Sequence, residues 1–282
     1  MNEETMKKPP ESFSDFEFEG WGSNSVCEYY DEHFGAVTIQ SVNAMLDVVN
    51  AREHDKVLDV CTGAGYAAGA ATERGANAIG IDFSESQIQL AKKRFPDAKF
   101  KIGDATDLPF DPDTFDAVVN GIGIPHFENP DVAIEEAFRV LKPGGKFAFT
   151  VYDKPQNAVG FGILYKAIQS YGSMDIGLPA GPNFFLFSDP EEGNSRLTSA
   201  GFQFIETNTI PQTWNLSSPE QLFEAVESGS VRAAATLKAQ TPEAQSAIKA
   251  AVTESLNEYK QGSGYELPMP VVLYSASKPV SN

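Results

Sequence analysis

The stretch that decides the fold is VLDVCTGAGYAAGAATERGANAIGIDF, residues 57–83. An apolar run that contains Asp59 is followed by a short turn with Gly63 and Gly65, an alanine-rich segment, and a second apolar run that ends at Asp82. A strand, a glycine-containing turn, a helix and a second strand in this order bind a nucleotide-like cofactor at the carboxyl edge of a parallel sheet. The stretch therefore predicts a cofactor site, but it does not distinguish a dinucleotide from an adenosyl sulfonium.

The sequence on both sides continues the alternation of strand and helix. Strands are predicted at 56–60, 77–82, 98–103, 115–121, 146–152, 202–210 and 270–277. Ser84 is predicted to cap the helix that follows the second strand, with Gln87 as its partner in a capping box. Short strands that alternate with helices form right-handed βαβ units. The sequence therefore predicts an α/β fold with a doubly wound, mostly parallel sheet of seven strands and with helical and aromatic cap insertions.

Composition and pattern divide the chain into five parts. Residues 1–20 are acidic, contain Pro and Ser and show no period, which predicts a mobile arm. The other parts are a helical segment (21–54), a cofactor-binding core (55–153), an aromatic-rich cap insertion for the substrate (154–200) and the C-terminal part of the sheet with a helical insertion (201–282). A chain of 282 residues is long enough to bury a large core around such a site.

Charge and cysteine content exclude several kinds of partner. The chain has 39 Asp and Glu against 21 Lys and Arg, a net charge of −18, which disfavours nucleic acid and anionic membrane surfaces. Its two cysteines are too few for a disulfide framework or a four-thiolate metal site. The sequence has no apolar run of about 18 residues and no apolar core of a signal peptide. We therefore expect a cytoplasmic protein with a small-molecule substrate and no membrane insertion; a homodimer is left open.

A third acid distinguishes the two cofactor hypotheses. Asp104, in the turn GDATDLPF, follows the third predicted strand and so lies at the same sheet edge as Asp59 and Asp82. Carboxylates accept hydrogen bonds from ribose hydroxyls and from an adenine amino group. No Lys or Arg lies between Lys56 and Arg74 to pair with a phosphate. The alternative is a turn-forming Asp without a ligand. Together the three acids favour an adenosyl sulfonium over NAD(P).

Four segments together resemble the successive motifs of class I S-adenosylmethionine-dependent methyltransferases. They are VLDVCTGAGY, IGIDFSESQIQLAKKRF, FKIGDATDLPFDPDTFDAVV and EEAFRVLKPGGKFAFTVYD. They are most similar to the branch of ubiquinone- and menaquinone-biosynthesis enzymes and related small-molecule methyltransferases. The resemblance implies S-adenosyl-L-methionine as the cofactor and a sheet whose last strand is antiparallel and lies between the fifth and sixth. It also implies that residues 21–54 fold over the cofactor as a lid.

The resemblance assigns cofactor-binding roles to individual residues. The amino-acid end of the cofactor would lie at Asp59, Gly63 and Gly65, the ribose at Asp82, the adenine at Phe83, Asp104 and Ala105, and the methionyl part at Asn120 and Gly121. Cys61, in the same loop, stands where the family usually has glycine, which predicts a slightly tighter or shifted turn. We interpret Cys61 as a packed residue rather than a nucleophile, because nothing basic neighbours it.

The catalytic candidates are fewer, because methyl transfer needs alignment and only sometimes a base. His126, in NGIGIPHFENP, follows the fourth predicted strand at the rim where substrates lie, so it is a candidate acid or base or a structural residue of the pocket. Tyr29 and Tyr30 are neighbours on a predicted helix and diverge, so at most one of them faces the cofactor. The alternative for both tyrosines is amphipathic packing.

The aromatic insertion is the candidate for substrate recognition. Its aromatic residues are predicted to line an apolar pocket under a lid that excludes water: Phe161, Tyr165, Phe184, Phe185 and Phe187. The alternative is that they form the core of the cap.

The leading hypothesis is therefore a methyltransferase that uses S-adenosyl-L-methionine to methylate a small, partly apolar metabolite at oxygen, carbon or nitrogen. Two alternatives remain: an NAD(P)-dependent oxidoreductase, and a protein that binds S-adenosylmethionine without transferring its methyl group, in the manner of a pericyclase or a sensor. No cluster of His and acidic residues predicts a required metal.

Overall fold

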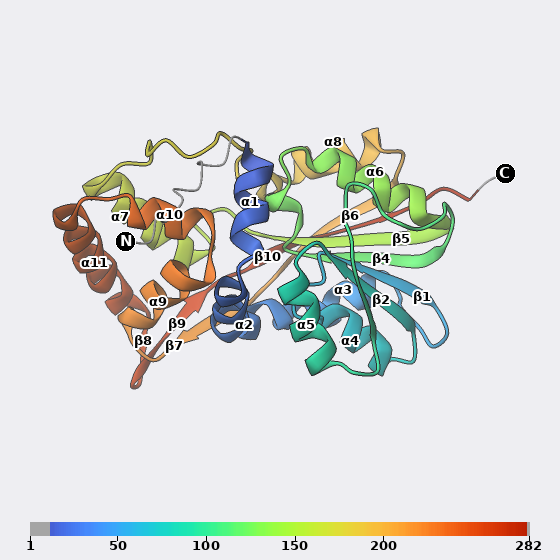
Figure 1. Ribbon diagram of the computed structural model, residues 1–282, viewed down its shortest axis with the longest axis horizontal. Helices are drawn as coiled ribbons and strands as arrows, with labels where there is room; N and C mark the ends of the chain where they lie inside the picture. The colour runs from blue at the N-terminus through green and yellow to red at the C-terminus, as the bar shows by residue number, and fades with distance from the viewer. Residues whose placement is uncertain (1–11, 281–282) are drawn as a thin grey trace, which may run out of the picture.

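The predicted alternation of strands and helices builds one seven-stranded sheet in the order β3-β2-β1-β4-β5-β10-β6. The computed structural model, which describes residues 12–280, is shown in Figure 1. The strands are β1 (Lys56–Val60), β2 (Asn77–Asp82), β3 (Lys99–Ile102), β4 (Phe115–Gly121), β5 (Leu141–Tyr152), β6 (Gln203–Ile210) and β10 (Val271–Ser277). Strands β1 to β5 are parallel, and β10 is antiparallel to both β5 and β6. The predicted fold class is confirmed, including the antiparallel strand between the fifth and the sixth.

Helices cover both faces of this sheet (Figure 1). One face carries α3 (Val42–Val48), α4 (Tyr66–Glu73) and α5 (Glu85–Arg94), and the other carries α6 (Pro130–Val140) and α8 (Pro190–Ser199). Adjacent residues of a strand point to opposite faces. In β10, Leu273 packs into the cluster with α3 and α4, whereas Tyr274 packs into the cluster with α6 and α8. The sheet is therefore buried on both sides, and its carboxyl edge is left for a ligand.

A second lobe lies beside the seven-stranded sheet, and its short strands were not predicted. Its helices are α7 (Val159–Tyr171), α9 (Pro219–Gly229), α10 (Arg232–Lys238) and α11 (Pro242–Leu256). Between them lies a three-stranded antiparallel sheet of β7 (Thr213–Leu216), β9 (Gly264–Pro268) and β8 (Lys260–Gln261). The sequence predicted only helices between the last two long strands. Strands of four, five and two residues are too short to show a clear alternation.

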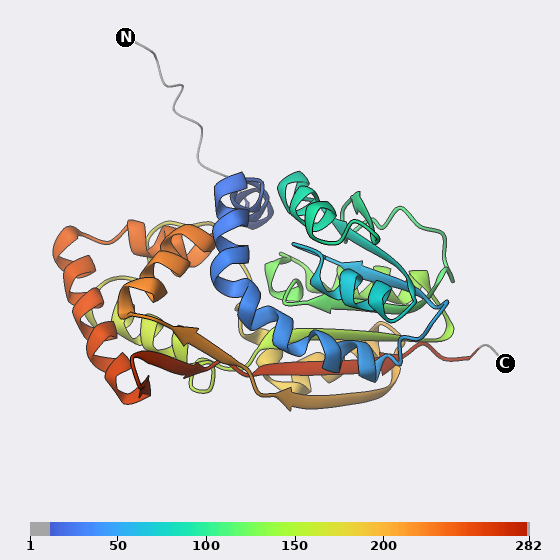
Figure 2. The same ribbon diagram turned by 90° about the horizontal axis from the view of Figure 1, so that it is seen from below.

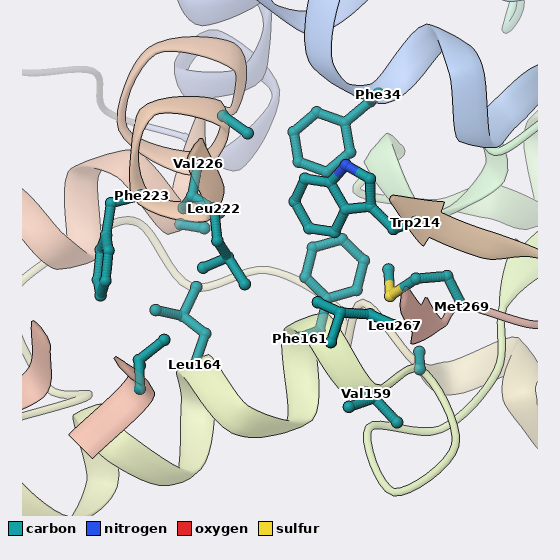
Figure 3. Packing of buried hydrophobic residues seen from close by; sticks show 14 of the residues in the cluster. Phe34, Val159, Phe161, Leu164, Trp214, Leu222, Phe223, Val226, Leu267 and Met269 are labelled. Carbon is teal, nitrogen blue, oxygen red and sulfur yellow. The ribbon is translucent and has the colours of Figure 1, made fainter. Parts of the chain in front are cut away.

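Aromatic packing joins this lobe to the rest of the molecule. Figure 3 shows Phe34 of α2 (Asn24–Thr38), Trp214 of β7 and Phe161 of α7 packed against one another. The ring centroids of Phe34 and Trp214 are 4.8 Å apart, and those of Phe34 and Phe161 are 6.3 Å apart. Single-turn 3₁₀ helices complete the described secondary structure: η1 (Ile39–Ser41), η2 (Ile124–His126), η3 (Leu186–Ser188) and η4 (Asn257–Tyr259).

The N-terminal segment departs from the prediction of a mobile arm over residues 1–20. Residues 1–11 of that arm lie outside the described residues, but the next ones form α1 (Phe13–Trp21). The Ser12 hydroxyl accepts a hydrogen bond of 3.0 Å from the Asp15 amide and caps the helix. Phe13 and Glu17, one turn apart, are buried. Helix α1 lies between the sheet and the second lobe (Figures 1 and 2), so it roofs the carboxyl edge of the sheet.

Candidate functional site

A cavity of about 560 Å³, here called the large cavity, lies at the carboxyl ends of the strands. Its floor comes from the ends of β2 and β4 and from the turn after β3, and α1 provides its roof through Ser14, Glu17, Phe18 and Trp21. Seven residues predicted to bind the cofactor line it: Cys61, Gly63, Asp82, Phe83, Asp104, Ala105 and Gly121. The topology thus brings together side chains from separate strand ends, as expected for a doubly wound sheet.

Acidic residues dominate the charge of the large cavity. Four acidic residues line it: Glu17, Asp82, Asp104 and Glu128. No lysine or arginine is found among its lining residues within the described part of the chain. Such a wall disfavours phosphate groups and suits a ligand that carries hydroxyls, an amino group and a positive charge.

Asp82 is held rigidly at the end of β2. Its Oδ2 accepts a hydrogen bond of 3.0 Å from the Gly63 amide, and its Oδ1 accepts one of 2.9 Å from the Ser84 amide. Burial raises the pKa of Asp82, and these backbone donors oppose that shift. Each carboxylate oxygen keeps a further lone pair, so Asp82 can accept ribose hydroxyls.

The two carboxylate oxygens of Asp104 differ in their hydrogen bonds. Its Oδ1 accepts hydrogen bonds from the amide and the hydroxyl of Thr106, at 2.8 and 2.7 Å. Its Oδ2 has no hydrogen bond within the described residues and can accept from an exocyclic amine. Phe83 lines the same wall, stacked on Phe18 at a centroid distance of 5.1 Å, which offers an aromatic face to a ring.

Three residues predicted to contact the cofactor do not line the large cavity. Asp59 is buried and does not line the cavity; its Oδ2 accepts from the Thr62 hydroxyl at 2.5 Å and from the Ala68 amide at 2.9 Å, so this oxygen holds the loop. Burial raises the pKa of Asp59 to about 7. The Oδ1 of buried Asn120 accepts from the Gly123 and Ile124 amides and caps η2.

Gly65 is the third of these residues. It has φ of +88°, and a Cβ there would lie 2.8 Å from the ring of Phe100 and 2.9 Å from Ala91. The need for glycine therefore comes from the backbone conformation and from the close approach of α5 and β3.

Cys61 lines the large cavity with a φ of +56°, in the left-handed region that glycine adopts most readily. This conformation gives a physical reason why cysteine is unusual here. Burial raises the pKa of the Cys61 thiol well above its ordinary value. The thiol is therefore neutral, in line with the interpretation of a packed residue.

A smaller cavity of about 80 Å³, here called the aromatic chamber, adjoins the large cavity. Five residues line both: Glu17, Trp21, Tyr30, Ile122 and His126. Of the predicted substrate residues, Phe161, Tyr165 and Phe184 line the chamber. Phe185 packs behind Phe161 at 6.2 Å. The chamber places an apolar, aromatic wall directly beside the acidic one.

Phe187 was predicted to line this pocket, and that prediction is wrong. It lies on η3, is 2% exposed, and packs edge-on against Phe149 of β5 at a centroid distance of 5.7 Å. The chain turns back toward the sheet after Phe184, so residues three positions apart belong to different cores.

His126 lies at the junction of the two cavities, on η2 after β4. Its Nδ1 is 2.8 Å from Oε2 of Glu17, and the Trp21 indole N–H donates to the same oxygen at 2.9 Å. Trp21 and Phe184 contact the imidazole edge-to-face, at centroid distances of 5.3 and 5.6 Å. Two aromatic rings and one carboxylate thus contact the imidazole.

Tyr30 and Tyr29 diverge, as expected for neighbours on a helix. Tyr30 lines both cavities, packs edge-on against Trp21 at 5.2 Å, and has its pKa raised to about 12 by burial. Tyr29 is 38% exposed and stacks on His33 at 6.0 Å. It lines neither cavity, so of the two tyrosines only Tyr30 is placed to contact a ligand.

Four residues of the site were missed in the sequence. Glu17 and Trp21 were assigned to the arm or to the segment after it, although with Phe13 they repeat every fourth residue, which is a helical spacing. Gln87 was predicted as a capping partner. The Ser84 hydroxyl does accept from the Gln87 amide at 3.3 Å, but Gln87 also lines the large cavity, and its buried Oε1 has no hydrogen-bond partner among residues 12–280. Tyr152 lines the chamber, and its buried hydroxyl likewise has no partner in the described part of the chain.

Two further properties bear on function. Among the described residues, no group of three or more His, Cys, Asp or Glu side chains is arranged to hold a metal ion. Within residues 12–280, none of the helices combines the length and the apolar character needed to cross a bilayer.

Comparisons with known proteins agree with this geometry. A family model described as a methyltransferase domain matches residues 58–149. The chain is 30% identical over 174 residues to a demethylmenaquinone methyltransferase of Clavibacter sepedonicus, which covers 55% of this chain and 69% of that protein.

Two solved structures share the fold over most of this chain. The [4+2]-cyclase SpnF matches with a TM-score of 0.59 and 20% identity, over 97% of this chain and 99% of its own. Phosphoethanolamine N-methyltransferase 2 of Haemonchus contortus, in complex with S-adenosyl-L-methionine, matches with a TM-score of 0.58 and 22% identity, over 95% of this chain and 60% of its own. At these identities the two likenesses show the fold alone.

Proposed function

The chain belongs to the class I S-adenosylmethionine-dependent methyltransferases of the menaquinone- and ubiquinone-like type, and from this we propose that it methylates a small, partly apolar ring compound of the quinol or phenol type. S-adenosyl-L-methionine is its cofactor. The comparisons do not favour the two alternatives, an oxidoreductase or a protein that binds the cofactor without methyl transfer.

The observation that carries the proposal is the junction of two chemically different cavities. The large cavity is acidic and free of lysine and arginine among its described lining residues, whereas the chamber beside it is aromatic. A cationic, phosphate-free cofactor fits the first, and an apolar acceptor fits the second. The shared residues lie where the two ligands would meet.

The residues of the large cavity fit S-adenosyl-L-methionine in one orientation. Asp82 would accept the ribose hydroxyls and the free Oδ2 of Asp104 the adenine amine, with Phe83 and Ala105 beside the ring. Cys61, Gly63 and Gly121 would then contact the amino-acid end. The Gln87 Oε1, which has no partner within residues 12–280, would gain a donor. When bound, this cofactor supplies a methyl group made electrophilic by its sulfonium. Asp59, Gly65 and Asn120 would support the loops without contact.

The chamber favours an acceptor with a flat ring and an oxygen. A cavity of about 150 Å³ holds benzene, so the chamber, at about 80 Å³, takes only part of a ring, and the rest would lie in the large cavity. The Tyr152 hydroxyl would donate to an oxygen of that ring, because it is buried and has no hydrogen-bond partner among the described residues. A demethylated quinol, as in the name of the relative, has both features.

Two residues at the junction would act on the acceptor. His126 contacts both cavities and is our candidate general base. Tyr30, whose pKa burial raises to about 12, stays a neutral hydroxyl and would orient the ligands as a hydrogen-bond donor.

The test combines binding with transfer. Calorimetry should show S-adenosylhomocysteine binding and no NADPH binding, and Asp82→Ala should weaken the former by about 1.5–3 kcal/mol through lost hydrogen bonds. Labelled S-adenosylmethionine should then pass its methyl to a short-chain demethylated naphthoquinol, with the product identified by mass spectrometry. Asp97→Ala, at an exposed site remote from the cavity, is the control. Tight NADPH binding would contradict the proposal, and so would cofactor binding without transfer to any of a panel of quinols and phenols.

A further inference from the structure

The most specific polar arrangement at the junction joins the roof to the rim. Glu17 is buried to 6% side-chain exposure, and its Oε2 contacts both the Nδ1 of His126 at 2.8 Å and the indole nitrogen of Trp21 at 2.9 Å. These partners come from α1 and from η2. Burying a carboxylate without partners costs free energy, so these two contacts stabilise Glu17 in its buried position.

The donor and acceptor roles in this cluster follow from its chemistry. An indole N–H can only donate, so Oε2 of Glu17 acts as an acceptor toward Trp21. A carboxylate accepts from both neighbours, which places the proton of a neutral His126 on Nδ1. Nε2 then carries a lone pair, and it makes no hydrogen bond within the described residues.

Aromatic contacts also restrict the imidazole. Trp21 and Phe184 both contact it edge-to-face, and Glu17 holds one nitrogen. An oriented imidazole with one nitrogen bound to a carboxylate and the other free is the arrangement that general-base catalysis requires.

We propose that Glu17 is a positioning residue that holds His126 as the Nδ1–H tautomer, so that Nε2 takes the proton of a ring hydroxyl and the methyl acceptor is a hydroxylated aromatic. This inference rests on the proposed function. In the step, the hydroxyl proton moves to Nε2 while an electron pair of the ring oxygen forms the O–CH₃ bond. The S–CH₃ bond breaks with its electrons going to sulfur, and S-adenosylhomocysteine leaves. The proton then passes from His126 to solvent.

The first test reads the tautomer without any ligand. The chain has only three histidines, so ¹⁵N spectra of histidine-labelled protein are simple, and His126→Asn assigns the signal of interest. We expect the Nδ1–H tautomer in the wild type. Glu17→Leu removes the acceptor for Nδ1–H, so the ring should lose its preference for this tautomer. An Nε2–H tautomer in the wild type, or no change in Glu17→Leu, would overturn the proposal.

The second test uses 1-naphthol and a nitro-substituted naphthol that is already ionised at the assay pH. With 1-naphthol, Glu17→Leu should lower kcat about 10²-fold, with KM and S-adenosylhomocysteine affinity changed only a few-fold. His126→Ala added to Glu17→Leu should cost little more, because the two act as one unit. With the ionised naphthol both defects should shrink, since no proton remains to be removed.

Control variants separate positioning from structure. Glu17→Asp keeps the carboxylate acceptor and should retain the wild-type tautomer and part of the activity. Glu19→Leu makes the same substitution at an exposed site of α1 and should match the wild type. Methylation at a ring carbon, or a Glu17→Leu defect that is equal for both naphthols, would contradict the proposal. A wild type that shows the expected tautomer but methylates no hydroxylated aromatic would instead refute the proposed function.

Discussion

Glu17 and His126 share a hydrogen bond of 2.8 Å although 109 residues separate them in the chain. One belongs to the roof helix α1 and the other to the turn after β4. The site is therefore not a property of the sheet alone, because its polar centre exists only when α1 is packed over the carboxyl edge. Four substitutions test separate parts of this arrangement.

Asp104→Asn tests how the adenine would be recognised. The carboxylate Oδ2 accepts from an amine and repels a carbonyl oxygen, whereas an amide can turn its N–H₂ toward a carbonyl. We expect the wild type to prefer S-adenosylhomocysteine over S-inosylhomocysteine by at least about tenfold, and the Asp104→Asn variant to lose most of this preference. Competitive calorimetry measures both affinities. An unchanged ratio would place the nucleobase elsewhere.

Asp59→Asn tests the pH dependence of stability. The pKa of Asp59 is raised from 3.8 to about 7, so between these values the folded protein holds a proton that the unfolded chain has lost. This contribution to stability is complete below the unfolded pKa, falls as the pH rises, and is lost above the folded pKa. An asparagine side chain cannot titrate and keeps an acceptor for Thr62 and Ala68.

We therefore expect Asp59→Asn to lose stability less steeply than the wild type from about pH 4 to pH 7, with a difference in slope of up to about 1.4 kcal/mol per pH unit. Urea unfolding at several pH values measures it, with Asp97→Asn at an exposed site as the control. Parallel curves for wild type and Asp59→Asn would show that Asp59 is not protonated in this range.

Cys61→Gly tests the strained backbone in the cofactor loop. A left-handed conformation costs a residue with a Cβ about 1–2 kcal/mol, while glycine adds about 0.5–1 kcal/mol of backbone entropy to the unfolded state. The φ of +56° therefore predicts a gain in unfolding free energy of up to about 1 kcal/mol. Cys27→Gly, in the first turn of α2 and fully buried, should instead destabilise the protein through the lost packing and the added backbone freedom. A loss of stability in both variants would argue against strain at Cys61.

Gly229→Ala tests the contact that positions Tyr30. A Cβ at Gly229 would lie 2.9 Å from the Tyr30 backbone nitrogen and 3.0 Å from the Tyr29 carbonyl carbon, and backbone atoms cannot swing away. The methyl group should push α9 and α2 apart, lower the unfolding free energy by about 1–3 kcal/mol, and weaken ligand binding at the junction. Denaturation and calorimetry with S-adenosylhomocysteine measure this. Glu224→Ala, exposed on the same helix, should change neither, and wild-type behaviour of Gly229→Ala would mean that the helices can separate without cost.

The parts of the site that could be predicted from the sequence depend on local pattern. Asp82 and Asp104 follow strands with clear apolar runs, and parallel strands bring their carboxyl ends to one edge, so both were placed correctly. Asp59 follows the same pattern, but its side chain bonds to Thr62 and Ala68 instead of facing the cavity. The position of an acid at a strand end is thus predictable, whereas the direction of its carboxylate depends on the turn that follows.

The remaining parts depend on contacts that no local pattern carries. Glu17 lies in a nine-residue helix that also carries the exposed acids Asp15 and Glu19, and only the contact with the distant His126 distinguishes Glu17 from them. Strands β7 and β9 pair across three intervening helices. Phe184 and Phe187 are close in sequence and similar in chemistry, and a single turn at η3 sends them to different cores.

The roof helix has one more consequence, which concerns the order of events in a catalytic cycle. Glu17, Phe18 and Trp21 of α1 lie over the large cavity, and Glu17 also supplies the bond that sets the state of His126. Any opening of α1 that lets ligands exchange therefore breaks that bond as well. His126 therefore cannot be held ready to accept a proton while ligands exchange. A more stable packing of α1 over the large cavity would improve the chemical step and slow product release.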